Sequence, residues 1–436
     1  MIGFGSRSMR CWVGVSVFLA WAGVACRGPE FQTATGGADP TGTGAGASGG
    51  ASPGGGGTGG TGGAAPREVL VEVVGRSGRP LADRPILVGD TSGETTQAGV
   101  TDMDGDLVVN AYDAGSITAI LNQGMFAHTV ILSGEVDHVR FVDFGGENTP
   151  VDVTIMGNCP DCNPADVTEY SMTCEVYRRE LGQNVTMSTD FLSVTGCAGE
   201  QDVDVAALNY TTDGELIAYA MLDDVPFEAG TIDLGEFIYQ GPVASVDVSW
   251  AGPTPALADD IAVLRFDGSS RTVLAKRTWT DMDMTIEVPP ELLDTAYVSY
   301  RFDLDDNTFV FGAQDLASGA IVFETEELDT PDDASHEPGP PETISWSTTG
   351  AVGDAVELII TRASGGQLVW APPEAEQIVL PTLPAPFADL ATGEVTTIEV
   401  RNHAADALVG YGAFLADSTW SLRPNAFVAG RTFTLQ

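Results

Sequence analysis

The spacing of apolar residues is the feature that most constrains what this 436-residue chain can fold into. From Arg67 onward, short β-type runs alternate with turn-forming residues, and no window sustains the 3.6-residue period of an amphipathic helix. About seven runs fall within roughly the first 90 residues of this region, a spacing typical of β-sandwiches. They are 69–74, 85–88, 107–112, 117–121, 128–132, 139–144 and 151–156. We therefore expect an all-β chain.

The N-terminus has the pattern of an export signal. Arg7 and Arg10 precede an apolar run, 12–22, which leads into Val24-Ala-Cys26. The run is roughly 11 to 15 residues long, shorter than the ~20 that a membrane-spanning helix needs, so residues 1–25 are predicted to be a cleaved signal peptide. The Val-Ala-Cys ending resembles the lipobox of bacterial lipoproteins. That resemblance implies that Cys26 carries the lipid anchor to the membrane; the alternative is an ordinary signal peptide that leaves Cys26 as a free thiol.

The segment 26–66 is predicted to be a disordered, glycine-rich tether. Glycine occupies nearly every second position from Thr35 to Ala65, so the segment has high chain entropy and almost no apolar surface to bury. A coil of about 40 residues has an r.m.s. span of about 35 Å. Arg27, and not an aspartate, follows the cysteine, which by resemblance favours an outer-membrane or cell-surface lipoprotein over one kept at the inner membrane. Without the anchor the chain would be secreted or periplasmic.

The charge is strongly acidic. Removing the two arginines of residues 1–25 leaves 17 basic residues against 62 acidic ones, and Lys276 is the single lysine. Such a chain repels nucleic acid and anionic lipid, because binding to either depends on basic residues that neutralise phosphate. Cations or cationic surfaces are the natural partners. Adaptation to a salty habitat explains the same charge equally well.

The first predicted sandwich also carries a family resemblance. Val69-Leu-Val-Glu-Val-Val74, Ser77-Gly-Arg-Pro-Leu81, Pro85-Ile-Leu-Val88 and Thr101-Asp-Met-Asp-Gly105 together resemble the carboxypeptidase regulatory-like domain. The resemblance covers about 67–156 and implies a transthyretin-like sandwich. It also implies an accessory role, because the family carries no catalytic residues to transfer.

Three further modules are expected after the first. Residues 157–241 form a disulfide-bearing β module, and 242–329 and 343–436 form Ig-like sandwiches joined by a Pro-rich linker at 330–342. The last two sandwiches are predicted to be repeats, because similar motifs recur in the same order at an offset of 91 to 96. Trp250 and Trp346 would then occupy the same strand position, buried against the opposite sheet or, alternatively, exposed as a ligand platform.

Four cysteines remain after Cys11, which leaves with the signal, and Cys26. They are Cys159, Cys162, Cys174 and Cys197, an even set for which disulfides are the expected state in an exported chain. We favour Cys174–Cys197 as a staple between strands and Cys159–Cys162 as a local bridge. A redox or zinc role for Cys159-Pro-Asp-Cys162 is the less favoured alternative, since no thioredoxin-like context is visible.

Metal and catalytic signals are weak. His128 and His138 flank a predicted turn and could face each other near Asp137, but zinc needs three or four ligands, so we expect both to be ordinary residues of the sheet surface. His336 falls in the linker and His403 stands alone. The acidic turns Asp102–Asp106 and Asp303–Asn307 could bind Ca²⁺ weakly, although a solvated turn is the simpler interpretation. Outside the low-complexity glycine-rich tether, no G-x-S-x-G, H-E-x-x-H or phosphate-loop motif is present. We expect no catalytic, cofactor or metal residues.

The sequence thus favours a non-enzymatic surface lipoprotein that acts as a binding, spacer or adhesion scaffold towards a surface protein or glycan. The alternatives are an exported enzyme with a divergent all-β catalytic module in 157–330 and a passive cation-binding envelope protein. Nothing in the sequence specifies an oligomeric state.

Overall fold

The computed structural model describes residues 66–435 apart from short stretches within that range. The stretches left out are 76–79, 122–123, 125, 135, 144–152, 164–165, 173–174, 181–183, 188–201, 213–214, 227–229, 252–256, 268–269, 279–282, 325–328, 363–364, 406–407, 409 and 418–425. All described elements belong to one compact unit, Gly63–Gln436. The predicted signal peptide, Cys26 and the tether lie outside the described residues. Strands dominate the described part, so the all-β prediction is confirmed.

The first sandwich packs a three-stranded sheet, in the order β4-β1-β7, against the strands β3-β2-β5-β6. The strand bounds are β1 Arg67–Gly75, β2 Pro85–Gly89, β3 Thr95–Val100, β4 Asp106–Ala111, β5 Ser116–Leu121, β6 Phe126–Ile131 and β7 His138–Asp143. Alternate residues of β1 fill the core, because successive side chains of a strand point to opposite faces. Val69, Val71 and Val73 are all fully buried there.

Two strands of this region differ from expectation. The strand β3 was not predicted, because its sequence, Thr-Thr-Gln-Ala-Gly-Val, is mostly polar; it is an edge strand and largely exposed. The last predicted run, 151–156, does form a strand, β8 (Val153–Asn158), but β8 pairs with β11 and β14. It therefore belongs to the second sandwich, and the expected boundary at 156 is wrong.

The second sandwich consists of a five-stranded sheet, β10-β9-β12-β13-β15, and a three-stranded sheet, β11-β8-β14. The bounds are β9 Val167–Met172, β10 Glu175–Glu180, β11 Asn184–Met187, β12 Asp202–Tyr210, β13 Leu216–Pro226, β14 Gly230–Glu236 and β15 Ile238–Tyr239. Its core contains Cys159, Cys162 and Tyr170. Leu208 and Tyr210 of β12 belong instead to the apolar cluster of the third sandwich, so the second and third sandwiches share buried surface.

The third and fourth sandwiches have the same strand order in their four-stranded sheets but not in their three-stranded sheets, because β22 pairs parallel with β16 whereas β23 pairs antiparallel with β24. In the third, β18-β17-β20-β21 faces β19-β16-β22; in the fourth, β26-β25-β28-β29 faces β23-β24-β27. The bounds in the third are β16 Ala244–Ala251, β17 Leu257–Asp267, β18 Ser270–Thr278, β19 Asp283–Val288, β20 Ala296–Asp303, β21 Thr308–Asp315 and β22 Ala320–Glu324, with 3-10 turns η2 at Pro290–Leu292 and η3 at Leu316–Ser318. Those in the fourth are β23 Asp333–Glu337, β24 Thr343–Ser347, β25 Ala355–Arg362, β26 Gly365–Ala371, β27 Gln377–Val379, β28 Val395–Ala405 and β29 Ala426–Thr434, with η4 at Ala388–Ala391 and the helix α1 at Tyr411–Asp417.

The two predicted tryptophans lie on corresponding strands. Trp250 is on β16 and Trp346 on β24, and each of these strands is the middle strand of its three-stranded sheet. Trp346 is 6% exposed, within the core of the fourth sandwich. The side chain of Trp250 lies outside the described residues. The matching order of the two four-stranded sheets is what two copies of one module would have, whereas β22 and β23 differ in chain position and direction, and descent from one module remains a proposal.

The expected linker at 330–342 contains a strand. Residues 333–337 form β23, which pairs antiparallel with β24, so the prediction of a plain linker is wrong. The prolines that suggested a linker lie in the turn between the two strands. Proline has no backbone N–H, but residues in this turn do not need to donate a hydrogen bond to the sheet. His336 lies on this strand and contacts Glu342, with 2.5 Å between Nε2 and Oε1.

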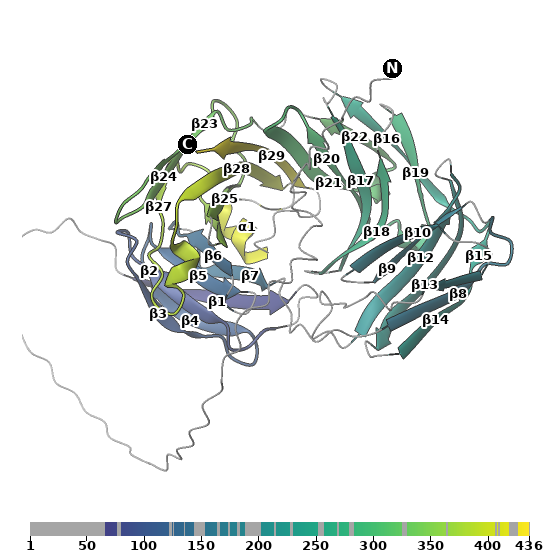
Figure 1. Ribbon diagram of the computed structural model, residues 1–436, viewed down its shortest axis with the longest axis horizontal. Coiled ribbons are helices and arrows are strands. Elements are labelled where there is room, and N and C mark those ends of the chain that lie inside the picture. The colour runs from purple at the N-terminus through teal and green to yellow at the C-terminus, as the bar shows by residue number, and fades with distance from the viewer. Residues whose placement is uncertain are drawn as a thin grey trace, which may run out of the picture. The chain divides into compact units, whose positions relative to one another are not determined.

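Three of the sandwiches share one sheet. Twelve strands run in the order β18-β17-β20-β21-β29-β28-β25-β26-β6-β5-β2-β3, which unites strands of the third, fourth and first sandwiches. Figure 1 shows β20, β21, β29 and β28 side by side in this sheet. The two junctions are the antiparallel pair β21–β29 and the parallel pair β26–β6. The modules are thus fused edge to edge through backbone pairing.

None of the helices in the described part of the chain has the length and apolar character that crossing a membrane requires.

Candidate functional site

The most unusual polar feature of the described chain is a buried charged cluster on the twelve-stranded sheet, formed by Glu357, Arg401 and His403. Glu357 lies on β25 and the other two on β28. Alternation along β28 places residues 399, 401 and 403 on one face of the sheet. Arg401 is the register partner of Glu357, which brings the two charges together.

The distances in this cluster are those of charge-assisted hydrogen bonds. Arg401 Nη1 donates to Glu357 Oε2 at 3.0 Å, and His403 Nε2 lies 3.0 Å from the same oxygen. Arg401 Nε donates to Glu399 Oε1 at 2.5 Å. Glu357 is fully buried, and Arg401 and His403 are each 1% exposed. Because a buried charge is costly unless it is paired, these contacts are what allow the groups to lie inside the protein.

Aromatic rings from two sandwiches surround the cluster. The guanidinium of Arg401 lies 5.3 Å from the ring of Phe311 on β21, and the His403 ring lies 4.7 Å from the Trp370 ring on β26. Phe414 of α1 contacts both Trp370 and His403, with ring centroids 5.2 and 6.0 Å apart. The cluster therefore lies where the third and fourth sandwiches meet.

His128 connects the first sandwich to the same region. It is on β6, buried, and its ring lies 5.2 Å from that of Phe141. Burial lowers the pKa of His128 from 6.5 to about 3, against the opposing effect of the Glu357 charge. His128 Nε2 has no hydrogen-bond partner among the residues that the structure describes. The ring is therefore neutral at physiological pH and behaves as a core side chain.

Arg401 is held in its charged form. Burial works to lower the pKa of Arg401, but the charges of Glu399 and Glu357 and their hydrogen bonds outweigh it, and the net shift is upward. The guanidinium is thus a permanent cation between two carboxylates. A network this closed to solvent offers no group to an external substrate. Its role is structural: the ion pairs join β25 to β28 within the fourth sandwich, beside the junction with the third.

Of the residues in this cluster, the sequence patterns had drawn attention only to His403, as an isolated histidine. A signal was present: Glu399, Arg401 and His403 alternate within a strand whose other positions are mostly apolar. Glu357 is likewise a single charge inside Ala355-Val-Glu-Leu-Ile-Ile360. A lone charge in a strand buried on both faces predicts an oppositely charged partner on a neighbouring strand.

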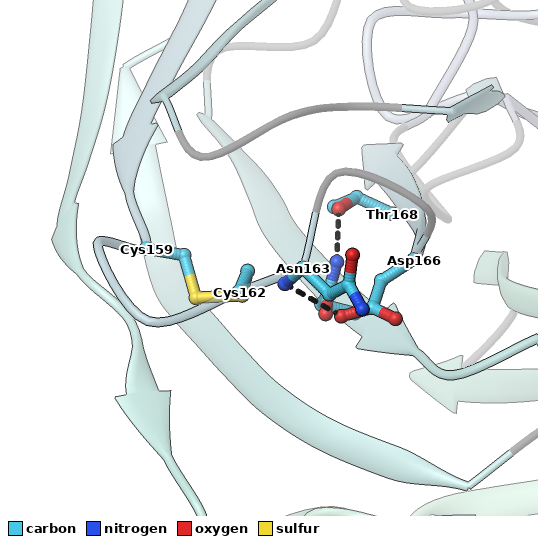
Figure 2. Close-up of a disulfide and its surroundings, with 6 residues drawn as sticks. Cys159, Cys162, Asn163, Asp166 and Thr168 are labelled. Atoms are coloured by element: carbon cyan, nitrogen blue, oxygen red, sulfur yellow. Dashed lines mark hydrogen bonds between the residues drawn. A yellow bond between two sulfur atoms is a disulfide. The ribbon is translucent and has the colours of Figure 1, made fainter.

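The predicted site cysteines fall in two groups. Cys159 and Cys162 are bonded to each other, with their Cα atoms 5.4 Å apart, and both are buried (Figure 2). Next to them the backbone N–H of Asn163 donates to Asp166 at 2.8 Å, which closes the turn that leads into β9 (Figure 2). Cys174 and Cys197 lie outside the described residues, as does Cys26, so their roles stay predictions.

The histidines and acidic turns do not form metal sites in the described part of the chain, where no group of three or more potential ligands converges. His128 and His138 do not face each other across a hairpin, because β6 and β7 lie in different sheets. His138 instead lies 3.4 Å from Glu72. His128 is also not a surface residue, contrary to the simpler expectation.

Both acidic turns are held by their own carboxylates. Asp102 Oδ1 accepts from the backbone N–H of Asp104 and Asp106 at 2.9 and 3.0 Å. Asp305 Oδ1 accepts from the N–H of Asn307 and Thr308 at 2.8 and 2.9 Å. These are the local hydrogen bonds of Asx-type turns. Weak Ca²⁺ binding stays a prediction.

Comparison with known proteins gives no family. No family model and no curated protein matches the sequence, so the resemblance to the carboxypeptidase regulatory-like domain stays a proposal. Among solved structures, a mutant of the shaft pilin SpaA from Lactobacillus rhamnosus GG is 8% identical, covering 40% of this chain and 97% of the pilin, with a TM-score of 0.17. The Bacillus anthracis TIE protein is 9% identical, covering 57% of this chain and 45% of that one, with a TM-score of 0.17. A structure from a 1.5-MDa bacterial ice-binding adhesin is 12% identical, covering 66% and 99%, with a TM-score of 0.14. These likenesses concern the β-sheet fold alone.

Proposed function

We propose that this chain is a non-enzymatic surface lipoprotein, anchored through Cys26 and a flexible tether, whose sandwiches act as a scaffold that spaces and presents a binding surface. The N-terminal signal and the Val-Ala-Cys ending support export and lipidation. The acidic composition supports a partner that is a surface protein or glycan, and opposes nucleic acid.

The observation that carries the proposal is the fusion of three sandwiches by one sheet. Sandwiches on flexible linkers move independently by default. Here the β21–β29 and β26–β6 pairings extend backbone hydrogen bonding across the junctions, and Glu357, Arg401 and His403 lie buried beside them. A body of this kind keeps its surfaces in fixed relation, which suits a spacer or presenting scaffold.

The anchor can be tested by cell fractionation. The full chain, expressed in a bacterium with an outer membrane, should appear in the membrane fraction and take up a fatty-acid analogue. The variant Cys26→Ser should be soluble and unlabelled, and the matched control Cys11→Ser, within the signal peptide, should behave as the native chain. Added protease should digest the native protein on intact cells if it lies at the surface. Unlabelled, persistent membrane association of the native chain would overturn the lipoprotein proposal.

A further inference from the structure

The edge of the three-stranded sheet in the first sandwich is open along β4. In the order β4-β1-β7, the edge strand β7 packs against α1, whereas β4 has no strand beyond it in the described chain. The N–H of Val73 donates to the carbonyl of Gly105 at 2.9 Å. Hydrogen-bonded pairs alternate in an antiparallel ladder, so residues 107, 109 and 111 bond to β1. The backbone groups of Val108 and Asn110 consequently point away from β1.

This edge lacks the usual protection against strand addition. Natural edges carry a lysine, a proline, a bulge or a covering element. The six residues of β4, Asp-Leu-Val-Val-Asn-Ala, contain no lysine or proline, and the register with β1 is unbroken. The neighbouring edge strand β3 differs, because its pairing with β2 is interrupted by a bulge. A partner strand thus meets regular, unpaired backbone at β4.

Apolar side chains are exposed at the same place. Met103 is 86% exposed, Val108 59%, Tyr112 43% and Val100 42%. These four belong to a set of nine large exposed hydrophobic residues in the described chain: Val108 lies on β4, Met103 and Tyr112 lie in the turns beside it, and Val100 ends β3. Clustered exposed apolar residues mark interaction sites more often than single ones do.

The charge at this edge selects the partner. Asp106 begins β4 beside Glu72, and the turn before it adds Asp102 and Asp104. Glu72 is already paired with Arg140 at 3.0 Å, whereas Asp106 makes no ion pair within the described chain. A strand added next to β4 would bring its own side chains beside Asp106 and Val108 on the outer face. A basic residue beside Asp106 would supply the missing countercharge.

We propose that the β4 edge receives an extended segment of a partner protein, rich in arginine or lysine, as a fourth strand of the β4-β1-β7 sheet. The partner's backbone pairs with Val108 and Asn110, and its basic side chain lies beside Asp106. Strand addition to an exposed edge is a general mode of peptide recognition, in which backbone bonds give affinity and side chains give specificity. A second copy of this chain fits poorly, because each copy has a formal net charge of −43. This inference deepens the proposed function by naming its partner class.

The test uses a fluorescein-labelled peptide of eight residues, alternating valine and arginine, and the full exported chain in detergent. Two isomeric peptides have the same charge but carry N-methyl groups on every arginine or on every valine. In an antiparallel arrangement the residue opposite Val108 shares its face and is an arginine, so arginine methylation should weaken binding at least tenfold and valine methylation should not. In a parallel arrangement the effects exchange. Equal affinity of both isomers would overturn strand addition in favour of nonspecific charge attraction.

The protein variants separate the edge from the overall charge. Val108→Lys introduces the lysine typical of protected edges, and binding should fall at least tenfold. The matched control Val322→Lys makes the same change at a valine that is 45% exposed on β22, and binding should stay within twofold. Equal losses in the two variants would overturn the site. Concentration-dependent dimers that Val108→Lys abolishes would replace the cationic partner with a second copy. None of these readouts depends on Cys26. Failure of the strand-addition proposal can therefore be distinguished from failure of the lipid-anchor proposal.

Discussion

Leu368 on β26 lies directly opposite His128 on β6, in a parallel register that joins the fourth sandwich to the first. The hydroxyl of Tyr411 on α1 adds a second link by donating to the carbonyl of Ile131, at 3.0 Å. Residues from nearly the two ends of the described chain therefore share one sheet and one apolar cluster. The predictions below follow from this junction and from the buried groups beside it.

Trp370→Ala should destabilise the chain by roughly 3–5 kcal/mol, the usual cost of deleting a large buried ring. Trp370 is fully buried in the cluster that contains the core of the first sandwich, so the loss affects both sandwiches. Denaturant unfolding, followed by circular dichroism, measures the change. The exposed Val352→Ala serves as the control and should stay within about 0.5 kcal/mol of the native chain. A Trp370→Ala variant as stable as this control would contradict the packing.

Arg401→Met should cost roughly 3–5 kcal/mol, because it leaves the fully buried carboxylate of Glu357 without its cationic partner. The double change Arg401→Met with Glu357→Leu should recover part of that loss, since an apolar pair needs no countercharge. Urea unfolding of the two single variants and the double variant gives the coupling free energy. Strictly additive losses would show that the two side chains do not interact.

His128 predicts a pH-dependent loss of stability. Its pKa is about 3 in the folded chain and 6.5 in the unfolded one. Below pH 6.5 the unfolded chain binds this proton and the folded chain does not. The free energy of unfolding therefore decreases as the pH falls towards 3. The full window is worth on the order of 5 kcal/mol.

The variant His128→Leu should remove this dependence. Melting temperatures of both proteins, measured from pH 7 to pH 4.5, should converge or cross at low pH, because leucine has no proton to gain. The many carboxylates titrate in both proteins, and the difference between the two curves cancels their effect. Parallel curves would show that His128 has the same pKa in the folded and the unfolded chain.

The cysteines predict two bridges. Peptide mapping under non-reducing conditions should find Cys159 joined to Cys162 and Cys174 joined to Cys197. The longer loop contributes roughly 3 kcal/mol in the chain-entropy model, so Cys174→Ala with Cys197→Ala should lower stability by about that amount. A fragment that links Cys159 to Cys174 would contradict the pairing.

Local patterns predicted most strands but not the connections between sandwiches. The short apolar runs of β1, β2, β5 and β7 were located to within a few residues. The strand β3 was not predicted because it is largely exposed and mostly polar, and β23 was not predicted because prolines follow it. Parallel pairing of β6 with β26 leaves no mark in either strand, since its register depends on residues far apart in the sequence.

The buried cluster was predictable only in part. His403 beside Asn402 looked isolated, because the partner Glu357 lies on a different strand and has no local signal that points to residue 403. The open β4 edge was equally hidden. In the sequence, Val108 looks like an ordinary core valine. Only the sheet order shows that β4 is an edge strand, with no further strand of the described chain paired to it.

The pairing of β6 with β26 has a consequence for how the chain is made. Synthesis proceeds from the N-terminus, so β6 is made long before β26 exists to pair with it. During that interval β6 is an uncovered strand beside the finished part of its sheet, open to the wrong partner. Pairings between such distant residues also form slowly, because a long loop must close first. The sheet of the first sandwich therefore stays open at β6 until the residues of β26 have been made.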